Sequence, residues 1–334
     1  GALSFWSCSD DDETTNGNKI TEEVKASTDV DGQLEGTSLT YQITSFSEFT
    51  AEVTGTTKLV DKKSYNGGFI VPAAIMHEGR IYRVTKIGDD AFAGCEKMTS
   101  VEFGQSIKEI GQDAFNSCRS LAALSLPKSL TTIDDGAFCH CGNLKSVVIP
   151  TGVTSLGNSA FYNCYSLTSV TIPNTVTEIG DMAFRDCSQL ATVVLPASVI
   201  YLGQSAFSNC TDLASVTLPA SLNTIMPSTF YGCSNLTAVT VPNCVLTIST
   251  SAFQNCKNLT ALALGESLES IESEAFSGCE KLAEITSFNT TPPALGSSVF
   301  NKVSTATCKL KVPKAAIANY KAATSKWSDF LNVE

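Results

Sequence analysis

Nine phenylalanines recur at a constant interval of 23 residues, and no insertion or deletion interrupts the series. A cysteine follows each of them after three residues. Such spacing is typical of a solenoid, in which each unit is too small to bury its own apolar face and must stack on its neighbours. We therefore predict two structural ladders inside one stack, formed by Phe92, Phe115, Phe138, Phe161, Phe184, Phe207, Phe230, Phe253 and Phe276 and by Cys95, Cys118, Cys141, Cys164, Cys187, Cys210, Cys233, Cys256 and Cys279.

The unit that ends at Phe184 shows how this pattern predicts one coil of the chain. Leu167, Val170 and Ile172 have the spacing of a leucine-rich strand with alternate residues pointing inward, and a proline ends that strand. Two further apolar residues return the chain across the core, and Gly180 allows a corner. A short helical turn is expected to begin at the Ala-Phe pair. Its free amides are expected to be capped by the side chains of Asp90, Asp113, Ser159, Ser205, Ser228 and Ser251 in their units.

The repeated pattern, Ala-Phe, two residues, Cys, two residues, Leu, two residues, Val, one residue, Ile-Pro, resembles the BspA-type leucine-rich repeats of bacterial surface proteins. The resemblance covers about residues 67–334. It implies a repeat solenoid, a right-handed stack of nine 23-residue units with parallel β-strands on one face. Proline stands after the strand where an ordinary leucine-rich repeat carries asparagine, so we expect no asparagine ladder at that position.

Both ends of the stack are expected to carry caps, because terminal coils would otherwise expose apolar surface. Alternating residues from Leu39 to Ile43 and from Phe49 to Val53 predict two strands, and Glu78 with Gly79 predicts a hairpin. An amphipathic segment from Ile317 to Phe330 predicts a short helical cap. The predicted parts are a signal remnant, lipidation cysteine and flexible acidic tether (1–32), an N-terminal β cap (33–90), the leucine-rich repeats (91–286) and a C-terminal cap (287–334).

The N-terminal residues carry a second resemblance. An apolar run that ends at Cys8 and is followed by acidic residues resembles the end of a bacterial lipoprotein signal and the acidic stretch of surface lipoproteins of the Bacteroidetes. Phe5 and Trp6 stand where such signals usually carry Leu and a small residue. The resemblance implies lipidation at Cys8 and an outer-membrane lipoprotein that faces outward. The alternative is a disordered terminus with an incidental thiol.

Charge and hydropathy restrict the partners. Acidic side chains outnumber basic ones by 33 to 22, and the net charge of −11 repels phosphate backbones and anionic lipid headgroups. We therefore expect no nucleic-acid partner. No apolar stretch approaches the roughly 18 to 20 residues of a membrane-spanning helix. Contact with a membrane is thus expected only through a lipid anchor.

The cysteines are interpreted as buried free thiols. Equivalent side chains of stacked coils point in the same direction, which fits a disulfide poorly, and free cysteine is among the most frequently buried residues. Cys139, His140 and Cys141 are too close in sequence to converge on one tetrahedral zinc ion. We predict no metal and no other cofactor.

Catalytic machinery is not visible in the sequence. The two histidines, His77 and His140, lie far apart, and no serine or cysteine triad can be assembled around them. Adjacent carboxylates, such as Asp134 and Asp135, fall at corner positions where solvent and capping explain them. We therefore expect that the protein is not an enzyme.

Two surfaces are candidates for binding. The first is the flat outer face of the predicted strands, formed by Ser100, Glu102, Ser125, Ser146, Val148, Ser169, Thr171, Thr192, Val194, Ser215, Thr217 and Thr240, although such residues also simply suit strands. The second is a turn-side patch of residue types favoured at interfaces, with Tyr162 and Arg185 on adjacent coils and Tyr231 in the same phase, and with Tyr165 and Tyr201 expected nearby.

The resemblance to BspA-like adhesins implies a surface lipoprotein that binds host extracellular proteins or other cells. A carbohydrate-binding surface protein of a gut bacterium is the alternative, and it would require exposed aromatic rings beside carboxamides or carboxylates. Among the candidate residues, only the region of Tyr162 and Tyr165 approaches that requirement in the sequence.

Overall fold

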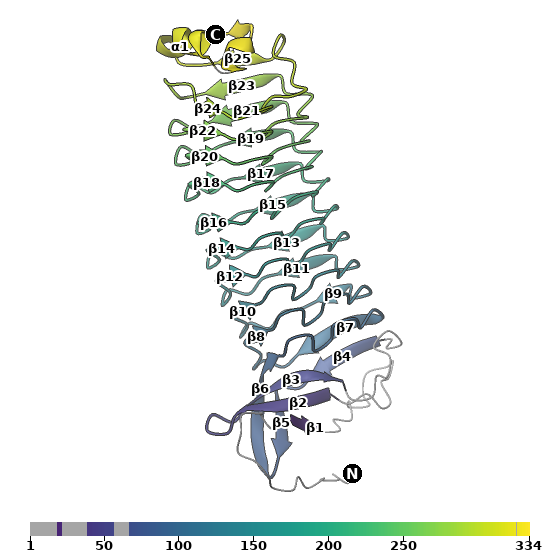
Figure 1. Ribbon diagram of the computed structural model, residues 1–334. Coiled ribbons are helices and arrows are strands. Elements are labelled where there is room, and N and C mark those ends of the chain that lie inside the picture. The colour runs from purple at the N-terminus through teal and green to yellow at the C-terminus, as the bar shows by residue number, and fades with distance from the viewer. Residues whose placement is uncertain (1–18, 22–38, 57–66, 325) are drawn as a thin grey trace.

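The computed structural model describes residues 19–21, 39–56, 67–324 and 326–334. These residues form a long parallel β-solenoid with repeats of 23 residues, a β-rich N-terminal end and a short helix at the C-terminal end (Figure 1). The predicted repeat solenoid is therefore confirmed. Cys8 and most of the predicted tether lie outside the described residues.

The N-terminal end is a small sheet that continues into the stack. Its strands run in the order β1-β2-β3-β6, with β5 paired to β6, and β6 then pairs in parallel with β8 of the solenoid. The predicted hairpin is the antiparallel pair β5–β6, whose turn holds Glu78 and Gly79 at φ values of 49° and 74°. The bounds are β1 (Lys19–Thr21), β2 (Leu39–Ser45), β3 (Thr50–Thr56), β5 (Ala74–His77) and β6 (Arg80–Ile87).

The predicted strand row forms one side of the solenoid, here called the long-strand face. Most neighbouring strands pair in parallel with a shift of one repeat, as in Val147 with Val170, so identical positions lie side by side. The row consists of β4 (Gly67–Val71), β7 (Met98–Phe103), β9 (Ala123–Leu124), β11 (Ser146–Val148), β13 (Ser169–Thr171), β15 (Thr192–Val194), β17 (Ser215–Thr217), β19 (Ala238–Thr240), β21 (Ala261–Leu264), β23 (Glu284–Ser287), β25 (Lys309–Lys311) and β26 (Asn332–Val333).

A second row of parallel strands, each two residues long, forms the short-strand face. From the sequence, these residues were expected only to return the chain across the core. Their second residue is an inward Ile or Leu, and the first points outward, as in Glu178 and Ile179. The row continues from β6 through β8 (Glu109–Ile110), β10 (Thr132–Ile133), β12 (Ser155–Leu156), β14 (Glu178–Ile179) and β16 (Tyr201–Leu202), and then through β18 (Thr224–Ile225), β20 (Thr247–Ile248), β22 (Ser270–Ile271) and β24 (Ala294–Leu295).

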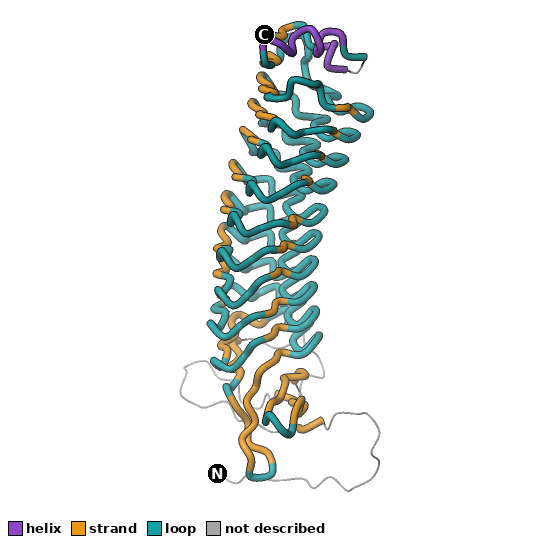
Figure 2. Tube along the Cα trace, turned by 90° about the vertical axis from the view of Figure 1, so that its left-hand side faces the viewer, coloured by secondary structure: helices purple, strands orange, loops and turns teal. Residues whose placement is uncertain are grey.

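The helical turn predicted at each Ala-Phe pair is wrong. This third side consists of successive turns (Figure 2), and its amides bond to the next coil, as in Phe161 N–H to Ala183 O at 2.8 Å. Asp113, Ser159 and Ser205, predicted as side-chain caps, instead hold positive φ values of 52°, 55° and 56°. The stacked neighbour supplies acceptors at every repeat, so the backbone is satisfied without a helix.

The phenylalanine ladder forms the centre of the core. All nine predicted rings are fully buried, and each lies nearly parallel to the next, at centroid distances between 5.0 and 5.8 Å. The ladder extends to a tenth ring, Phe300, beyond the predicted units. Trp327 and Phe330 then cover Phe300 at 5.4 and 5.3 Å and close the stack.

The C-terminal cap contains the one α-helix of the described residues, α1 (Ile317–Ala322), between the 3₁₀ helices η2 (Lys314–Ala316) and η3 (Lys326–Asp329). Tyr320 and Trp327 are fully buried, and the indole N–H of Trp327 donates to Pro293 O at 2.8 Å. The polar ends of both aromatic side chains are thus satisfied, because the hydroxyl of Tyr320 lies 2.7 Å from that of Ser287.

The cysteines of the ladder are buried and form no disulfide bonds, as predicted. The structure adds a contact that the sequence did not predict: each thiol from Cys118 to Cys279 donates to the carbonyl of the phenylalanine of the preceding coil, at 3.2 to 3.3 Å. Cysteine therefore combines the size of a small apolar residue with a weak donor, which adds a second hydrogen bond to a carbonyl that already accepts a backbone amide.

Replacing Phe184 with Ala should lower the free energy of unfolding by roughly 3 to 5 kcal/mol, because the ring is fully buried between two others. Urea unfolding followed by circular dichroism measures the change. Val194→Ala is the control: this side chain is 76% exposed and should change stability by less than about 0.5 kcal/mol. A loss below about 1 kcal/mol for Phe184→Ala would contradict a central role for the ring.

Alkaline pH should unfold the protein. Burial raises the pKa of Cys233 and Cys279 to about 12 and of Cys139 to about 11, whereas an unfolded thiol titrates near about 8.5. At a pH between the unfolded and the folded pKa, the thiols of the unfolded chain release protons that the thiols of the folded chain retain. Each such thiol then lowers the free energy of unfolding by about 1.4 kcal/mol per pH unit. The contribution of each buried thiol to the free energy of unfolding is fully present below about pH 8.5, and it is lost as the pH rises toward the pKa of the folded thiol.

Circular dichroism and ultraviolet thiolate absorbance across an alkaline titration measure this effect together. We expect both signals to change in one cooperative step. Replacing four ladder cysteines with Ala should make the fall of stability with pH less steep, since fewer protons are released. Thiolate absorbance that rises fully while the circular dichroism stays native would contradict the burial of the ladder.

Candidate binding surfaces

The outward residues of the long-strand face lie where the sequence predicted them. Of the predicted set, Ser100 alone is half-buried and the others are exposed; Glu102 is the one charged member. Val148 and Val194 are 63% and 76% exposed, and Thr171 lies between them in the row. Because the strands pair in register, the result is a flat, almost uncharged surface of small side chains and two exposed valines.

Hydroxyl groups on this face differ from those elsewhere on the solenoid. On other rows, threonine hydroxyls tie successive coils together, as in Thr168 to Lys145 O at 3.1 Å and Thr260 to Thr237 O at 3.1 Å. Within the described part of the chain, the hydroxyls of Thr171, Thr217 and Thr240 make no such bond. Suitability for strands explains their presence, but their hydrogen-bonding capacity is left for solvent or a partner.

The residues of the predicted turn-side patch are held by local contacts. Tyr162 and Arg185 occupy equivalent positions of successive coils, as predicted, but their side chains make local contacts: the Tyr162 ring lies 5.1 Å from His140, and Arg185 Nε lies 3.6 Å from the carboxylate of Asp186. Tyr231 accepts a hydrogen bond from Asn255 at 3.2 Å. All three predicted residues are half-buried.

Tyr165 is 46% exposed and follows Tyr162 in sequence by three positions. Its ring lies against Gly142 of the preceding coil, where a Cβ atom would collide with the ring. Glycine at that position therefore allows the ring to lie on the backbone. Tyr165 offers an exposed aromatic side chain, and it does not line either of the two hollows described below.

Tyr201 does not lie on the turn side where Tyr162 lies. Tyr201 belongs to β16 on the short-strand face, because it occupies the outward position of a second strand row that sequence analysis did not recognise. Its hydroxyl donates to Asp181 Oδ1 at 3.1 Å. Burial and the neighbouring Asp181 carboxylate raise the pKa of this hydroxyl.

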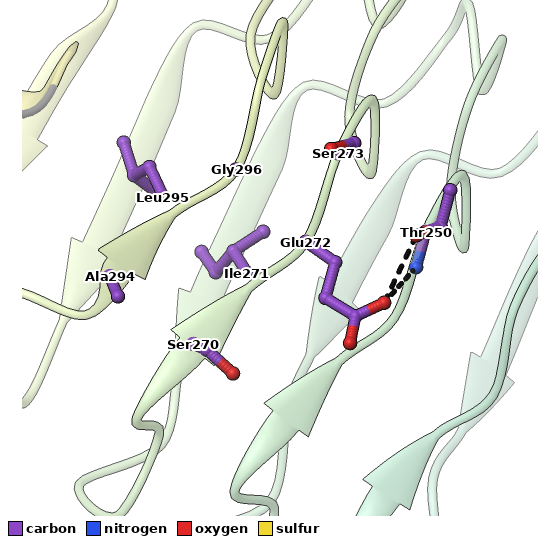
Figure 3. A pocket seen from close by; sticks show the side chains of 8 residues that line it. All are labelled: Thr250, Ser270, Ile271, Glu272, Ser273, Ala294, Leu295 and Gly296. Carbon is purple, nitrogen blue, oxygen red and sulfur yellow. Dashed lines mark hydrogen bonds between the residues drawn. The ribbon is translucent and has the colours of Figure 1, made fainter.

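The short-strand face contains two shallow hollows. The first, here called the Tyr201 hollow, has a volume of about 280 Å³. Its lining includes the outward strand residues Thr132, Ser155, Glu178 and Tyr201 and the corner residues Asp134 and Asn158. The second, the Glu272 hollow, has a volume of about 320 Å³ and is lined by the residues drawn in Figure 3. In the Glu272 hollow the carboxylate of Glu272 accepts from both the amide and the hydroxyl of Thr250, at 2.9 and 3.0 Å (Figure 3). Neither hollow was predicted from the sequence.

A ladder of Asp and Asn side chains runs along the corner that follows the short strands. Asp135 accepts from the amide of Asn158 at 2.6 Å, Asn158 from that of Asp181 at 2.8 Å, and Asp181 from that of Gln204 at 2.8 Å. The expected absence of an asparagine ladder concerned the end of the long strands. The 23-residue recurrence of Asp and Asn at this corner was the signal that could have indicated the ladder.

The two histidines lie apart in the structure, as their positions in the sequence indicate. His140 Nδ1 lies 2.8 Å from Asn163 Nδ2, and His77 lies in the N-terminal hairpin. Among the described residues, no three His, Cys, Asp or Glu side chains are arranged to hold a metal ion. Within the same residues, no helix is both long and apolar enough to cross a membrane.

Residues 81–191 and 178–307 match the sequence model of the BspA type leucine rich repeat region. The chain therefore belongs to the BspA-type leucine-rich repeat family. The phenylalanine and cysteine ladders lie within this matched part, so the repeat predicted from the sequence is the repeat that defines the family.

Several solved structures of bacterial proteins have similar folds. A protein from Bacteroides ovatus is 23% identical with a TM-score of 0.60, over 91% of this chain and 76% of its own. A leucine rich repeat protein of T. pallidum is 32% identical with a TM-score of 0.51, over 59% of this chain and 86% of its own. The pneumococcal vaccine antigen PcpA is 20% identical with a TM-score of 0.58, over 83% of this chain and 80% of its own. No curated protein matches the chain.

Proposed function

We propose that this protein is a non-catalytic cell-surface protein that binds a protein partner, from a host or from another cell, through its long-strand face. The supporting observation is the regular row of exposed Ser, Thr and Val side chains, whose hydroxyls do not tie the coils together. Thr171, Val194 and Thr217 lie near the middle of this row, away from both caps.

The lack of charged side chains favours this face as the protein-binding surface over the remainder of the molecule. The chain carries a net charge of −11, yet the strand positions from Ser125 to Thr240 on this face carry no charge. Protein interfaces are depleted in charged residues at their centres, and association there avoids desolvation of carboxylates. Membership of a family whose proteins are commonly surface-associated supports the same role.

We further propose that the protein is an outer-membrane lipoprotein anchored at Cys8 and facing outward. The support is the sequence around Cys8, where an apolar run precedes the cysteine and acidic residues follow it. Several acyl chains at one cysteine would anchor the protein firmly. Mass spectrometry of the protein from bacterial membranes tests the anchor, and a Cys8→Ala variant that remains in the membrane fraction would contradict it.

Binding to immobilised extracellular matrix proteins tests the long-strand face. The double variant Thr171→Glu with Val194→Glu places two charges in the centre of the row and should weaken binding at least about tenfold, a loss of about 1.4 kcal/mol. The control matched in charge is the double variant Thr151→Glu with Thr154→Glu, two exposed threonines outside this row, which should change affinity less than about twofold. Equal losses in both variants would show that net charge, and not this face, controls binding.

Carbohydrate binding is the second candidate function. It requires an exposed aromatic ring beside carboxylates or carboxamides, and the Tyr201 hollow provides this combination. The two functions use different faces, so separate substitutions distinguish them.

A further inference from the structure

We propose that the Tyr201 hollow is a binding subsite for a neutral saccharide, with one sugar ring stacked on Tyr201 and its hydroxyls bonded to the polar lining. This inference deepens the second candidate function and depends on it, but it does not depend on protein binding by the long-strand face. The residues that carry it come from β10, β12, β14 and β16 and from the corners that follow them.

The hollow exists because close packing of the coils requires glycine at its floor. A Cβ atom on Gly180 would lie 2.7 Å from the amide nitrogen of Asn158, and one on Gly157 would collide with the backbone of Asp134. These positions therefore carry no side chain. The outward residues Thr132 and Ser155 are short. Space remains between the outward strand residues and the corner ladder, and it is open to solvent.

Tyr201 provides an aromatic wall at the C-terminal end of this hollow. The equivalent outward positions of the short-strand row are otherwise Lys, Glu, Thr, Ser or Ala, so Tyr201 is the one aromatic residue among them. Tyr201 is 39% exposed, and its hydroxyl donates a hydrogen bond to the carboxylate of Asp181. The same carboxylate accepts a hydrogen bond from the backbone amide of Gln204. The ring is thus fixed before a ligand arrives, which lowers the entropic cost of binding.

The end of a sheet lies next to this ring. The short strands pair continuously up to β16, and the next strand, β18, belongs to a separate sheet. Between the corresponding rings of the core, Phe207 and Phe230, the distance is 5.8 Å, compared with 5.3 Å between Phe184 and Phe207. Within the described residues, Tyr201 therefore has no paired strand on its C-terminal side.

The polar lining suits hydroxyl donors. Asp134 and Glu178 supply carboxylates, and Thr132 and Ser155 supply hydroxyls that both donate and accept. Asp134 is half-buried, and burial together with nearby Glu109 raises the pKa of its carboxyl. The lining contains no Lys or Arg, so a neutral sugar fits it better than an anionic one, which three acidic side chains (Asp134, Asp135 and Glu178) would repel.

The Glu272 hollow is a natural comparison within the same chain. It has a similar volume and lies on the same face, but its lining contains no aromatic residue. Its one carboxylate already accepts two hydrogen bonds from Thr250. A ring platform and available carboxylates therefore distinguish the Tyr201 hollow from a hollow that results from coil stacking alone.

An array of neutral and acidic oligosaccharides, followed by calorimetric titration with the neutral oligosaccharide bound most strongly, tests the proposal. Tyr201→Ala should weaken binding at least about tenfold, Tyr201→Phe less than about threefold because the ring remains, and Glu178→Gln at least about threefold. The matched control is Tyr165→Ala, which removes a tyrosine of similar exposure outside the hollow and should change affinity less than about twofold. Thermal unfolding of each variant verifies the fold.

Three results would overturn the subsite. The first is an array with no neutral oligosaccharide bound, and the second is an equal loss in Tyr165→Ala. The third is stronger binding of an oligolysine peptide that depends on Glu178 but not on Tyr201, since this would indicate a general attraction for cations. The variant Thr171→Glu with Val194→Glu should leave oligosaccharide binding unchanged, so failure of the long-strand face and failure of the hollow are distinguishable.

Discussion

Hydrogen bonding between equivalent positions of successive coils is the interaction on which the remainder of the structure depends. Backbone amides on all three sides of the solenoid reach the next or the preceding coil, at an offset of about one repeat. A shift by one residue would exchange inward and outward side chains on every strand. Ring stacking and the thiol contacts reinforce this register. Each ring stacks on its counterpart in the next coil, and each thiol donates to the phenylalanine carbonyl of the preceding coil.

The sequence predicted the core well because the core repeats. Phe184 and Cys187 are buried where the period places them, and Val170 points inward as alternation requires. The turns were harder. Asp113 and Ser159 are residue types that both cap helices and adopt positive φ, and a single sequence does not distinguish these uses. The presence of acceptors on the neighbouring coil decides the outcome, and this is a property of the stack and not of one unit.

The candidate sites were less predictable for the same reason. The exposed row through Thr171 and Val194 follows from strand alternation, so its position could be predicted. Tyr201 could not be placed, because its row consists of strands of two residues, too short for a visible alternation. The hollow beside it depends on Gly157 and Gly180, whose role is close approach of the backbone and not a corner alone. Features between coils are invisible when one unit is considered by itself.

The uniform register of the ladders also determines how such a protein can change in length. Each coil contributes one ring, one thiol and two short segments of strand, and it meets its neighbours through surfaces that recur at every repeat. A duplication of 23 residues would therefore extend the rod by about 4.8 Å while leaving both caps intact. The coil from Phe276 to Phe300 has 24 residues and still continues the phenylalanine ladder, so a turn can hold one extra residue. A deletion that leaves only part of a coil would interrupt the ladders at that point. Growth and shortening by whole coils is therefore the route open to this architecture, and the distance between its two ends changes in steps.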